Sequence, residues 1–177
     1  MRGARNVILV GMMGAGKTTA GRLLARRLKR VFYDSDQEVE RRCGVRIPVI
    51  FEIEGEAGFR ARESAVVADL TELDGIVLAT GGGAVLAEEN RRRLAARGTV
   101  IYLHARPDAL YERVRQDRNR PLLAHGDARL RLAELYAQRD PLYREIADIV
   151  VETGRQSVPS LARHVLARLK EAWKLSA

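Results

Sequence analysis

Residues 11–18, GMMGAGKT, match the pattern G-x-x-x-x-G-K-[ST] and lie directly between an apolar, β-branched run and a helical pattern. Glycines here let the backbone wrap closely around phosphate groups, and the following helix N-terminus adds N–H donors that favour a polyanion. In such a loop Lys17 reaches the β- and γ-phosphates and the Thr18 hydroxyl binds Mg²⁺. A chance glycine-rich turn would not require this strand and helix context. The pattern therefore predicts a nucleoside triphosphate site at the end of a buried strand.

Five short apolar runs alternate with longer amphipathic stretches, and we interpret the runs as strands buried on both faces. They are residues 7–10, 31–33, 76–79, 100–103 and 149–151. Helical spacing predicts three apolar stripes: Ala20, Leu23, Leu24 and Leu28; Val66, Leu70 and Leu73; and Leu161, Val165, Leu169 and Trp173. Strands that alternate with helices predict a parallel sheet and a doubly wound α/β fold. Ligands of such folds bind at the carboxyl ends of the strands.

Length and composition favour a single domain spanning residues 1–177. The chain has one cysteine, Cys43, and no apolar run near the roughly 20 residues that cross a bilayer, so we expect a cytoplasmic protein without a membrane partner. The formal net charge is +8, but basic residues are spread along the chain and aromatic residues make up 5%, so nucleic acid is not an expected partner. Arginine clusters at residues 26–27 and 91–93 lie in helical patterns and are interpreted as solvated faces.

The triphosphate motif leaves the reaction open, and nearby residues narrow it. The N-K-x-D motif of GTPases is absent, and residues 79–83, ATGGG, carry no acid where many P-loop proteins place a metal-binding aspartate. Asp34 and Asp36 follow the second predicted strand and, in extended chain, would project to the same side, toward the phosphates. One would help hold the water shell of Mg²⁺ while the other accepts a proton from an attacking hydroxyl. Alternatively, Ser35 or Asp36 caps the helix that follows.

Several other positions are ambiguous when each is taken alone. The glycines at 81–83 follow a buried strand, where they permit either the close approach of a ligand or a plain tight turn. Arg60, Arg120 and Arg139, taken singly, are ordinary surface arginines. Arg120 belongs to residues 116–127, QDRNRPLLAHGD, a polar stretch with proline and glycine that we interpret as a candidate lid.

Together these motifs resemble the shikimate kinase family, over the chain from about Asn6 to Leu169. The P-loop, D-x-D at 34–36, F-x-x-x-G-E-x-x-F-R at 51–60, G-G-G at 81–83, R-P-L-L at 120–123 and R-x-P-L-Y at 139–143 occur in the family's order. The resemblance implies a P-loop, nucleoside-monophosphate-kinase-like fold: a three-layer sandwich with a central parallel sheet of about five strands and helices on both faces. It also implies transfer of the ATP γ-phosphoryl group to the 3-hydroxyl of shikimate, a step of chorismate and aromatic amino acid biosynthesis.

The resemblance further implies roles for individual residues. Shikimate would bind Asp36, Arg60, Gly82 and Arg139, since its carboxylate suits an arginine fork. ATP would bind Gly14, Ala15, Gly16, Lys17, Thr18, Thr19, Arg113 and Arg120, with Mg²⁺ held by Thr18 and, through water, by Asp34. The implied catalytic residues are Lys17, Asp36 and Arg120. Arg155 and Gln156 lie at the family's adenine loop, where the pattern is loose and leaves open which of them contacts the nucleotide. The histidines, His104, His125 and His164, match no functional position, and we interpret them as structural or solvent-exposed.

Two other functions fit parts of the pattern. A related kinase acting on gluconate or a nucleoside monophosphate would share the P-loop but need a different acceptor pocket. A module that only senses nucleotide or shikimate would keep the fold and lose the chemistry, which the intact Lys17, Thr18, Asp34, Asp36 and Arg120 argue against. We expect a monomeric enzyme that acts on shikimate and ATP and uses Mg²⁺.

Overall fold

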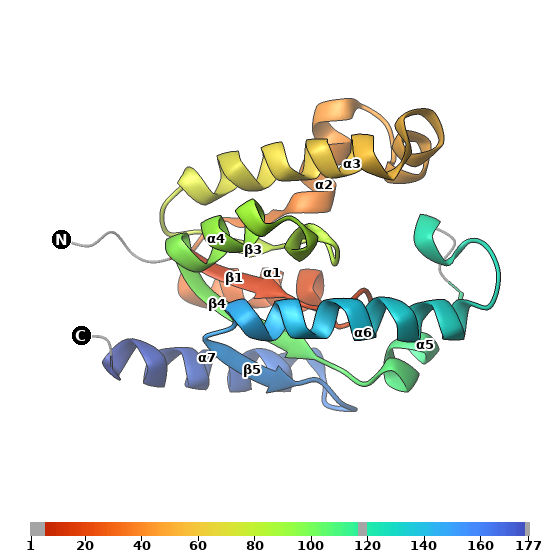
Figure 1. The fold of residues 1–177 in the computed structure, drawn as a ribbon. Coiled ribbons are helices and arrows are strands. Elements are labelled where there is room, and N and C mark those ends of the chain that lie inside the picture. Colours follow the sequence, from red (N-terminus) through yellow and green to blue (C-terminus); the bar gives the residue numbers. More distant parts are fainter. Residues whose placement is uncertain (1–5, 117–119, 176–177) are drawn as a thin grey trace.

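The computed structural model describes residues 6–116 and 120–175, and Figure 1 shows a central sheet between two layers of helices. Five parallel strands form the sheet in the order β2-β3-β1-β4-β5. Their bounds are β1 Asn6–Val10, β2 Phe32–Asp34, β3 Val77–Ala79, β4 Gly98–His104 and β5 Ile149–Glu152. The predicted three-layer, parallel α/β fold is confirmed.

Right-handed crossovers decide which face of the sheet each helix covers. The chain moves from β1 to β2 through α1 on one face, and the later crossovers run back across the sheet on the other face. One layer therefore holds α1 (Lys17–Leu28) and α7 (Val158–Leu175), and the other holds α3 (Ile47–Glu72), α4 (Glu88–Arg97) and α6 (Ala128–Ile146). The shorter elements are α2 (Ser35–Cys43), η1 (Ala84–Leu86), α5 (Pro107–Val114) and η2 (Pro121–Leu123). Among the described residues, none of these helices is long and apolar enough to span a membrane.

The two edge strands differ from the prediction that all five strands are buried on both faces. β1, β3 and β4 are buried along their whole length, as predicted. β2 forms one edge and is half-buried, and Val31, predicted as its first residue, precedes it and is 59% exposed. β5 forms the other edge, where Val150 is half-buried and Glu152 is exposed. Apolar composition does not distinguish these strands from central ones, because strand order decides how many neighbours cover them.

The three predicted apolar stripes lie on α1, α3 and α7 and pack against the sheet. Two stripe residues are exceptions: Leu23 is only half-buried and does not belong to the core, and Leu73, the C-cap of α3, is 40% exposed. Trp173 packs against the core as predicted, and its indole N–H donates to Thr99 Oγ1 at 3.0 Å. The helical spacing therefore identified the buried faces, although it ran one turn too far in α3.

Arg91 differs from the solvated face predicted for residues 91–93. Its guanidinium donates to the carbonyl oxygens of Val85 at 2.8 Å and Leu86 at 3.3 Å, and it pairs with Glu145 of α6 at 3.2 Å. Arg91 thus ties η1 to α6. Its neighbours at 92 and 93 do pair with acids along the surface of α4.

Candidate active site

The P-loop, residues 11–18, joins the end of β1 to the start of α1, as predicted. Gly14 and Gly16 have φ values of +79° and +91°, a region that side chains rarely adopt, and Gly16 is the N-cap of α1. A cavity of about 670 Å³ lies against this loop at the carboxyl edge of the sheet, and we call it the phosphate cavity. Its lining includes Lys17, Thr18 and Asp34.

Lys17 is the first residue of α1, and its ammonium group folds back over the loop. Nζ donates to the carbonyl oxygens of Gly11 at 2.6 Å and Met12 at 2.8 Å. Burial lowers the pKa of Lys17 to about 8, while the negative charge of Asp36 opposes this shift. At neutral pH the side chain therefore keeps its positive charge beside the phosphate cavity.

Thr18 and Asp34 form a pair in the same cavity. The Thr18 hydroxyl donates to Asp34 Oδ2 at 2.6 Å, and Asp34 Oδ1 accepts from the backbone N–H groups of Asp36 and Gln37 at 3.0 and 3.2 Å. The N-cap of α2 is therefore Asp34, not Ser35 or Asp36 as the sequence allowed. Within residues 6–116 and 120–175, no cluster of three or more His, Cys, Asp or Glu forms a metal site. Any cation here would need further oxygens from water or a ligand.

Asp36 lies in the first turn of α2 and not in extended chain as expected, yet it reaches the same cavity as Asp34. Its Oδ1 is buried without a hydrogen-bond partner among the described atoms. Burial, followed by the negative charges of Glu63 and Asp34, raises the pKa of Asp36 to about 7. A carboxylate in this state can accept a proton near neutral pH.

Glu63 is a buried acid that the sequence analysis missed. It is 1% exposed; Oε1 accepts from Arg60 Nη1 at 2.8 Å, and Oε2 has no partner among the described atoms. Burial raises the pKa of Glu63, and the Arg60 guanidinium opposes that shift. Helical spacing could have identified it, because Glu63 shares a stripe of α3 with Phe59, Val66 and Leu70. An acid on a buried stripe is rare unless it is paired.

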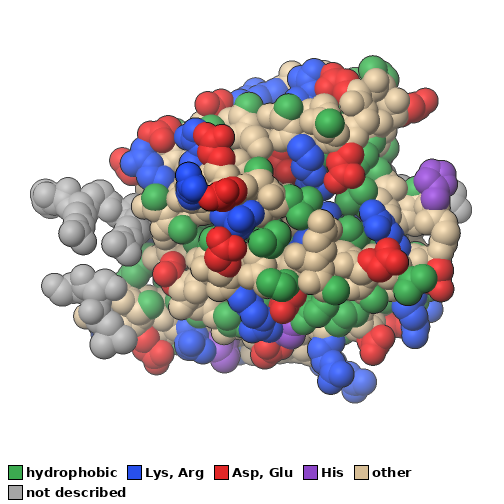
Figure 2. Space-filling view, viewed as in Figure 1, with side chains coloured by type: hydrophobic (Ala, Val, Ile, Leu, Met, Phe, Trp, Pro, Cys, Tyr) green, Lys and Arg blue, Asp and Glu red, His purple; other side chains and the backbone are tan. Residues whose placement is uncertain are grey.

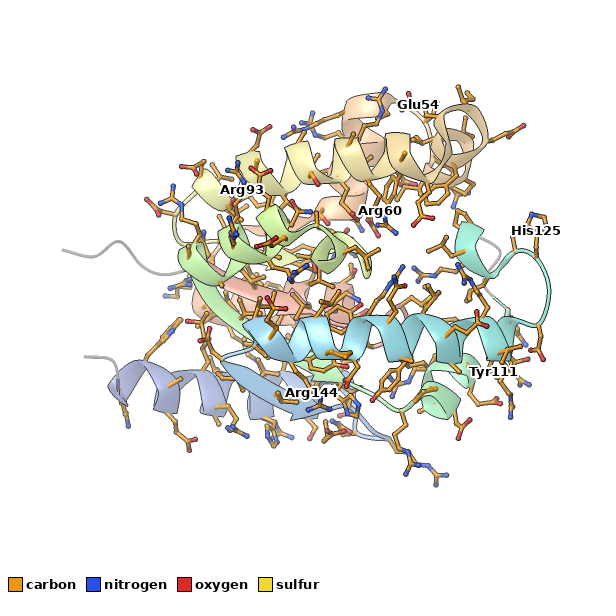
Figure 3. All side chains as sticks on the ribbon, in the orientation of Figure 1. Glu54, Arg60, Arg93, Tyr111, His125 and Arg144 are labelled. Atoms are coloured by element: carbon orange, nitrogen blue, oxygen red, sulfur yellow. The ribbon has the colours of Figure 1, made fainter. Side chains whose placement is uncertain are left out.

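A second cavity, of about 500 Å³, opens beside the first, and we call it the acceptor cavity. Arg60 extends into it from α3, on the side that faces α6 (Figure 3), and Arg139 lines it from α6. Arg139 is 1% exposed, and its Nε lacks a hydrogen-bond partner among the described atoms. Two guanidinium groups facing one cavity can bind a carboxylate. The apolar part of the wall consists of Met13, Ile47, Phe51, Phe59, Pro121 and Leu122.

The glycines at 81–83 lie against the charged side chains of these cavities. A Cβ at Gly81 would lie 2.4 Å from Asp36 Oδ1, and one at Gly83 would lie 2.3 Å from the Arg60 guanidinium nitrogens. None of the three has a positive φ, so a tight turn does not require them. The glycines therefore make room for Asp36 and Arg60, a reason that neither alternative from the sequence had included.

A third cavity lies on the other side of the P-loop, and we call it the base cavity. Gly14, Gly16 and Thr19 line both it and the phosphate cavity. Arg113 lies at this cavity, where its guanidinium donates to the carbonyl oxygens of Gly14 at 3.0 Å and Gly154 at 2.9 Å. Arg113 therefore connects the P-loop to the loop after β5.

The two residues proposed for the adenine loop are placed differently. Gln156 lines the base cavity, and its amide closes the loop: Nε2 donates to the Glu152 carbonyl at 2.9 Å, and Oε1 accepts from the Gly154 N–H at 2.6 Å. Arg155 is exposed and does not line the described cavity. The structure thus brings Gln156, and not Arg155, to the cavity.

Arg120 lines both the phosphate and the acceptor cavity. It precedes η2, whose Pro121 and Leu122 also line the acceptor cavity. Asp127, at the end of the candidate lid, is the N-cap of α6. Within that lid, residues 117–119, which include Arg118, lie outside the described residues.

The histidines are distributed as the sequence analysis expected. His104 is buried between Glu152 and Tyr136, whose side-chain oxygens lie 2.7 Å from its ring nitrogens. His125 and His164 are exposed. None of the three lines the base, phosphate or acceptor cavity described above.

The three cavities follow one another along the carboxyl edge of the sheet. The base cavity adjoins the phosphate cavity across the P-loop, and Met13, Asp36, Gly82 and Arg120 line both the phosphate and acceptor cavities. A nucleotide extended along the P-loop would place its terminal phosphate beside Asp36. The arrangement therefore suits transfer of a phosphoryl group to a small molecule in the acceptor cavity.

Comparison with known proteins identifies relatives of the chain. The family model described as Shikimate kinase matches residues 13–170. A shikimate kinase of Thiobacillus denitrificans is 62% identical over 164 residues, which cover 93% of this chain and 90% of the relative. One of Cupriavidus pinatubonensis is 60% identical over 170 residues, which cover 96% and 88%. The solved structure of shikimate kinase from Acinetobacter baumannii in complex with shikimate has a TM-score of 0.93 and 47% identity, covering 95% of this chain and 94% of that chain.

A more distant likeness concerns the fold alone. The crystal structure of a gluconokinase from Sinorhizobium meliloti has a TM-score of 0.60 and 16% identity, covering 100% of this chain and 99% of that chain. Since a fold can serve several acceptors, this likeness does not assign one.

Proposed function

The chain belongs to the shikimate kinase family, and from that membership we infer that it transfers the γ-phosphoryl group of ATP to the 3-hydroxyl of shikimate. The products are shikimate 3-phosphate and ADP, in a step of aromatic amino acid biosynthesis. The observation that carries the mechanism is the position of Asp36, which lines both the phosphate and the acceptor cavity.

Asp36 is the proposed general base. The 3-hydroxyl oxygen forms a bond to the γ-phosphorus while its proton passes to the Asp36 carboxylate, and the bond from the γ-phosphorus to the bridging oxygen breaks to release ADP. The buried, unpartnered Oδ1 and its pKa of about 7 support this role. An acid of ordinary pKa would be a weaker base for the same hydroxyl.

Lys17 and Arg120 are the proposed stabilisers of the transferring phosphoryl group. The Lys17 ammonium would exchange the Gly11 and Met12 carbonyls for oxygens of the β- and γ-phosphates. Arg120 lines both cavities, so its positive charge lies near the phosphoryl group before and after the transfer. Fixed charges in a site closed to water contribute more than the same charges would in solution.

Mg²⁺ is the proposed cofactor, with Thr18 binding it directly and Asp34 through water. Their oxygens face the phosphate cavity and form a hard-oxygen pair, which fits an ion that usually keeps several waters and binds few protein groups. When bound, this ion neutralises charge on the β- and γ-phosphates. Thr18 and Asp34 hold their side chains in place through their mutual hydrogen bond and the cap of α2.

Arg60 and Arg139 are proposed to bind the shikimate carboxylate, with Gly82 and Asp36 completing the substrate site. Glu63 would hold the Arg60 guanidinium in position through its 2.8 Å hydrogen bond. Because Arg139 is buried and its Nε is unpartnered, an anionic ligand would satisfy a donor that the protein leaves open.

On the nucleotide side, the proposed ligands of ATP are Gly14, Ala15, Gly16, Lys17, Thr18, Thr19, Arg113 and Arg120. Arg113 would lie against adenine, since it crosses the base cavity between the P-loop and Gly154. Gln156 would hold the loop after β5 in place through its side-chain hydrogen bonds to the backbone of Glu152 and Gly154. Gln156 lines the base cavity and Arg155 does not, so Gln156 is the proposed nucleotide contact of the two.

We further propose a cytoplasmic monomer with one domain over residues 1–177 and a lid at residues 116–127. Residues 120–122 of the lid already line the acceptor cavity.

A coupled ADP-release assay with shikimate, gluconate and nucleoside monophosphates in parallel tests the assignment. We expect turnover that requires shikimate and Mg²⁺. Equal ADP formation with and without shikimate, or faster turnover with another acceptor, would refute it.

A further inference from the structure

The net charge of the protein lies in one helical layer. Residues 17–30 and 158–175, which include α1 and α7, contain ten of the 31 Lys and Arg residues and one of the 23 acids, Glu171. Their formal charge is +9, of which one charge, Lys17, belongs to the phosphate cavity, whereas the remainder of the chain has 21 basic and 22 acidic residues. Basic residues that are scattered along the sequence are therefore balanced everywhere except in this layer.

Ion pairing also separates the two layers. Twelve arginines outside α1 and α7 form salt bridges with Asp or Glu. Figure 2 shows acidic and basic side chains intermixed on the face that carries α3, α4 and α6. In the described part of the chain, no salt bridge involves the following exposed cations of the other layer: Arg26, Arg27, Arg163, Arg168, Lys170 and Lys174.

The helix dipole explains part of this distribution. Arg26 and Arg27 occupy the last turn of α1, and Lys174 occupies the last turn of α7, where a cation stabilises a helix. It does not explain Arg163 in the first half of α7, nor the near absence of acids from both helices. The opposite layer, in contrast, pairs most of its arginines with acids.

The two helices lie side by side and run in the same direction. Their N-terminal ends meet at the base cavity, which Thr19 and Leu161 both line. Their C-terminal ends meet where the Arg30 guanidinium lies 5.0 Å from the centroid of the Trp173 ring. Exposed cations on α1 therefore form a row beside those on α7.

These rows have dimensions that follow from helix geometry. Arg163, Lys170 and Lys174 share one face of α7 and span about 16 Å at a rise of ~1.5 Å per residue. Arg22 and Arg26 share one face of α1. Because packed helices lie about 8–10 Å apart, cations of both helices can contact the backbone of one duplex, whose major groove in B-DNA is ~12 Å wide.

We propose that the exposed cations of α1 and α7, the α1/α7 face, bind the phosphate backbone of double-stranded nucleic acid without sequence preference. Two parallel rows of cations match phosphates on both sides of a groove. A single strand would need exposed rings for stacking, but the one aromatic residue of these helices, Trp173, is half-buried and bonded to Thr99. A membrane would need exposed apolar side chains among the cations, whereas Val165 and Leu169 are buried in the core. The expectation that nucleic acid is no partner is replaced by this proposal.

The test compares two variants with the same net charge. The α1/α7 variant carries Arg26→Gln, Arg27→Gln, Lys170→Gln and Lys174→Gln. The matched control carries Arg92→Gln, Arg93→Gln, Arg97→Gln and Arg131→Gln, all ion-paired residues of the opposite layer. Neither set of substitutions includes a residue of the proposed active site, so shikimate-dependent kinase activity verifies that both variants fold. Binding is followed by fluorescence anisotropy with a labelled 20-base-pair DNA duplex from 50 to 300 mM salt.

Phosphate contacts release counterions, so each is worth about eightfold in affinity at 0.1 M salt, from a slope of about −0.9 per contact. We expect the wild type to bind with a Kd of about 1–100 μM. If half of the four substituted side chains contact phosphate, the α1/α7 variant should bind about 60-fold more weakly and lose about two units of salt slope. The control should lose less than about threefold.

Several results would overturn the proposal. These are an absence of duplex binding at 50 mM salt, equal losses in the two variants, or tighter binding to a 20-nucleotide single strand. Anionic phosphatidylserine vesicles serve as a second probe, and binding to them but not to the duplex would assign the face to a membrane. If the α1/α7 variant with its four substitutions loses kinase activity, the double variant Lys170→Gln, Lys174→Gln replaces it. The expected change in the salt slope of duplex binding is then half as large.

Discussion

Gly81→Ala is a substitution whose effect can be worked out from the geometry of the site. The added Cβ would lie 2.4 Å from Asp36 Oδ1 and 2.9 Å from Glu63 Oε2, and both oxygens are buried. Asp36 could make room only by moving into the cavities that it lines, which would take it from the position required of the base. The glycine cannot easily retreat, because its N–H donates to Ser35 Oγ at 2.8 Å.

The required displacement sets the size of the effect. Ordinary van der Waals contact begins near 3.4 Å, so Asp36 Oδ1 must move by about 1 Å from its 2.4 Å position. A displacement of about 1 Å in a reacting group can reduce the rate by about 10²-fold. Overpacking a buried site also lowers the free energy of unfolding by about 1–3 kcal/mol. We therefore expect kcat to fall by about 10²-fold in a protein that still folds.

Two neighbouring glycines provide matched controls. A Cβ at Gly83 would meet the Arg60 guanidinium at 2.3 Å, but this flexible group is 21% exposed and can swing away, so the KM for shikimate should rise more than kcat falls. At Gly82 the nearest atom, Arg139 Nη1, lies 3.3 Å away and belongs to a buried side chain of the proposed shikimate site, so the KM for shikimate should rise while kcat falls less than in Gly81→Ala. Steady-state kinetics by coupled ADP release and thermal unfolding measure all three variants.

A kcat of Gly81→Ala within about fivefold of the wild type would refute the predicted clash, since the base would then tolerate the displacement. Equal losses of kcat in the three alanine variants would refute it as well. That result would indicate general disruption of the loop and not a clash with Asp36.

The site supports four further predictions. Lys17→Met should lower kcat by about 10²-fold or more without unfolding the protein, and more than a tenth of wild-type kcat would contradict its role. Raised Mg²⁺ should restore part of the activity lost in Asp34→Asn and almost none of that lost in Asp36→Asn. If activity depends on the Mg²⁺ concentration in the same way in both variants, Asp34 and Asp36 do not have the separate roles of metal binding and proton acceptance. Because a base acts when deprotonated and the pKa of Asp36 is raised to about 7, kcat/KM for shikimate should increase with pH through about 7. Glu63→Gln removes one charge that raises this pKa and should shift the acid limb to lower pH; an unmoved limb would show that Glu63 has no such effect. Arg120→Ala should lower kcat much more than it weakens binary shikimate binding, and hydrogen exchange over residues 120–127 should slow when both substrates bind; equal protection with and without ligands would remove the lid assignment.

Local patterns predicted the strands, most of the helical faces and the P-loop, because each depends on residues close in sequence. The glycines at 14 and 16 adopt the positive φ values that the motif requires, and the stripe ending at Trp173 packs as helical spacing indicated. The approach of Asp36 to the phosphate cavity was also anticipated, although by a different backbone path. Asp34 ends β2 and caps α2, so Asp36 reaches the cavity from the first helical turn.

Other features required the whole chain in three dimensions. Glu63 reaches the acceptor cavity because α3 packs across the carboxyl edge of the sheet, and a single sequence does not place an acid of one helix beside an aspartate of another. The role of the glycines at 81–83 depends on side chains from α2 and α3 that meet them only after folding. Contacts between segments far apart in sequence bring these side chains together, and neither segment carries a periodic pattern that predicts the contact.

The amino-acid sequence by itself determined the α/β fold, the triphosphate loop and the set of motifs that identifies the family, since backbone conformation and burial along one element repeat with a short period. The tertiary structure alone decided which strands are edges, which acids share a cavity and where the net charge lies. Crossover handedness places α1 and α7 together on one face of the sheet, so cations separated by more than a hundred residues, such as Arg26 and Lys170, become neighbours in one layer. Strand order and layer assignment arise from how elements pack against one another, and that packing depends on all of them at once.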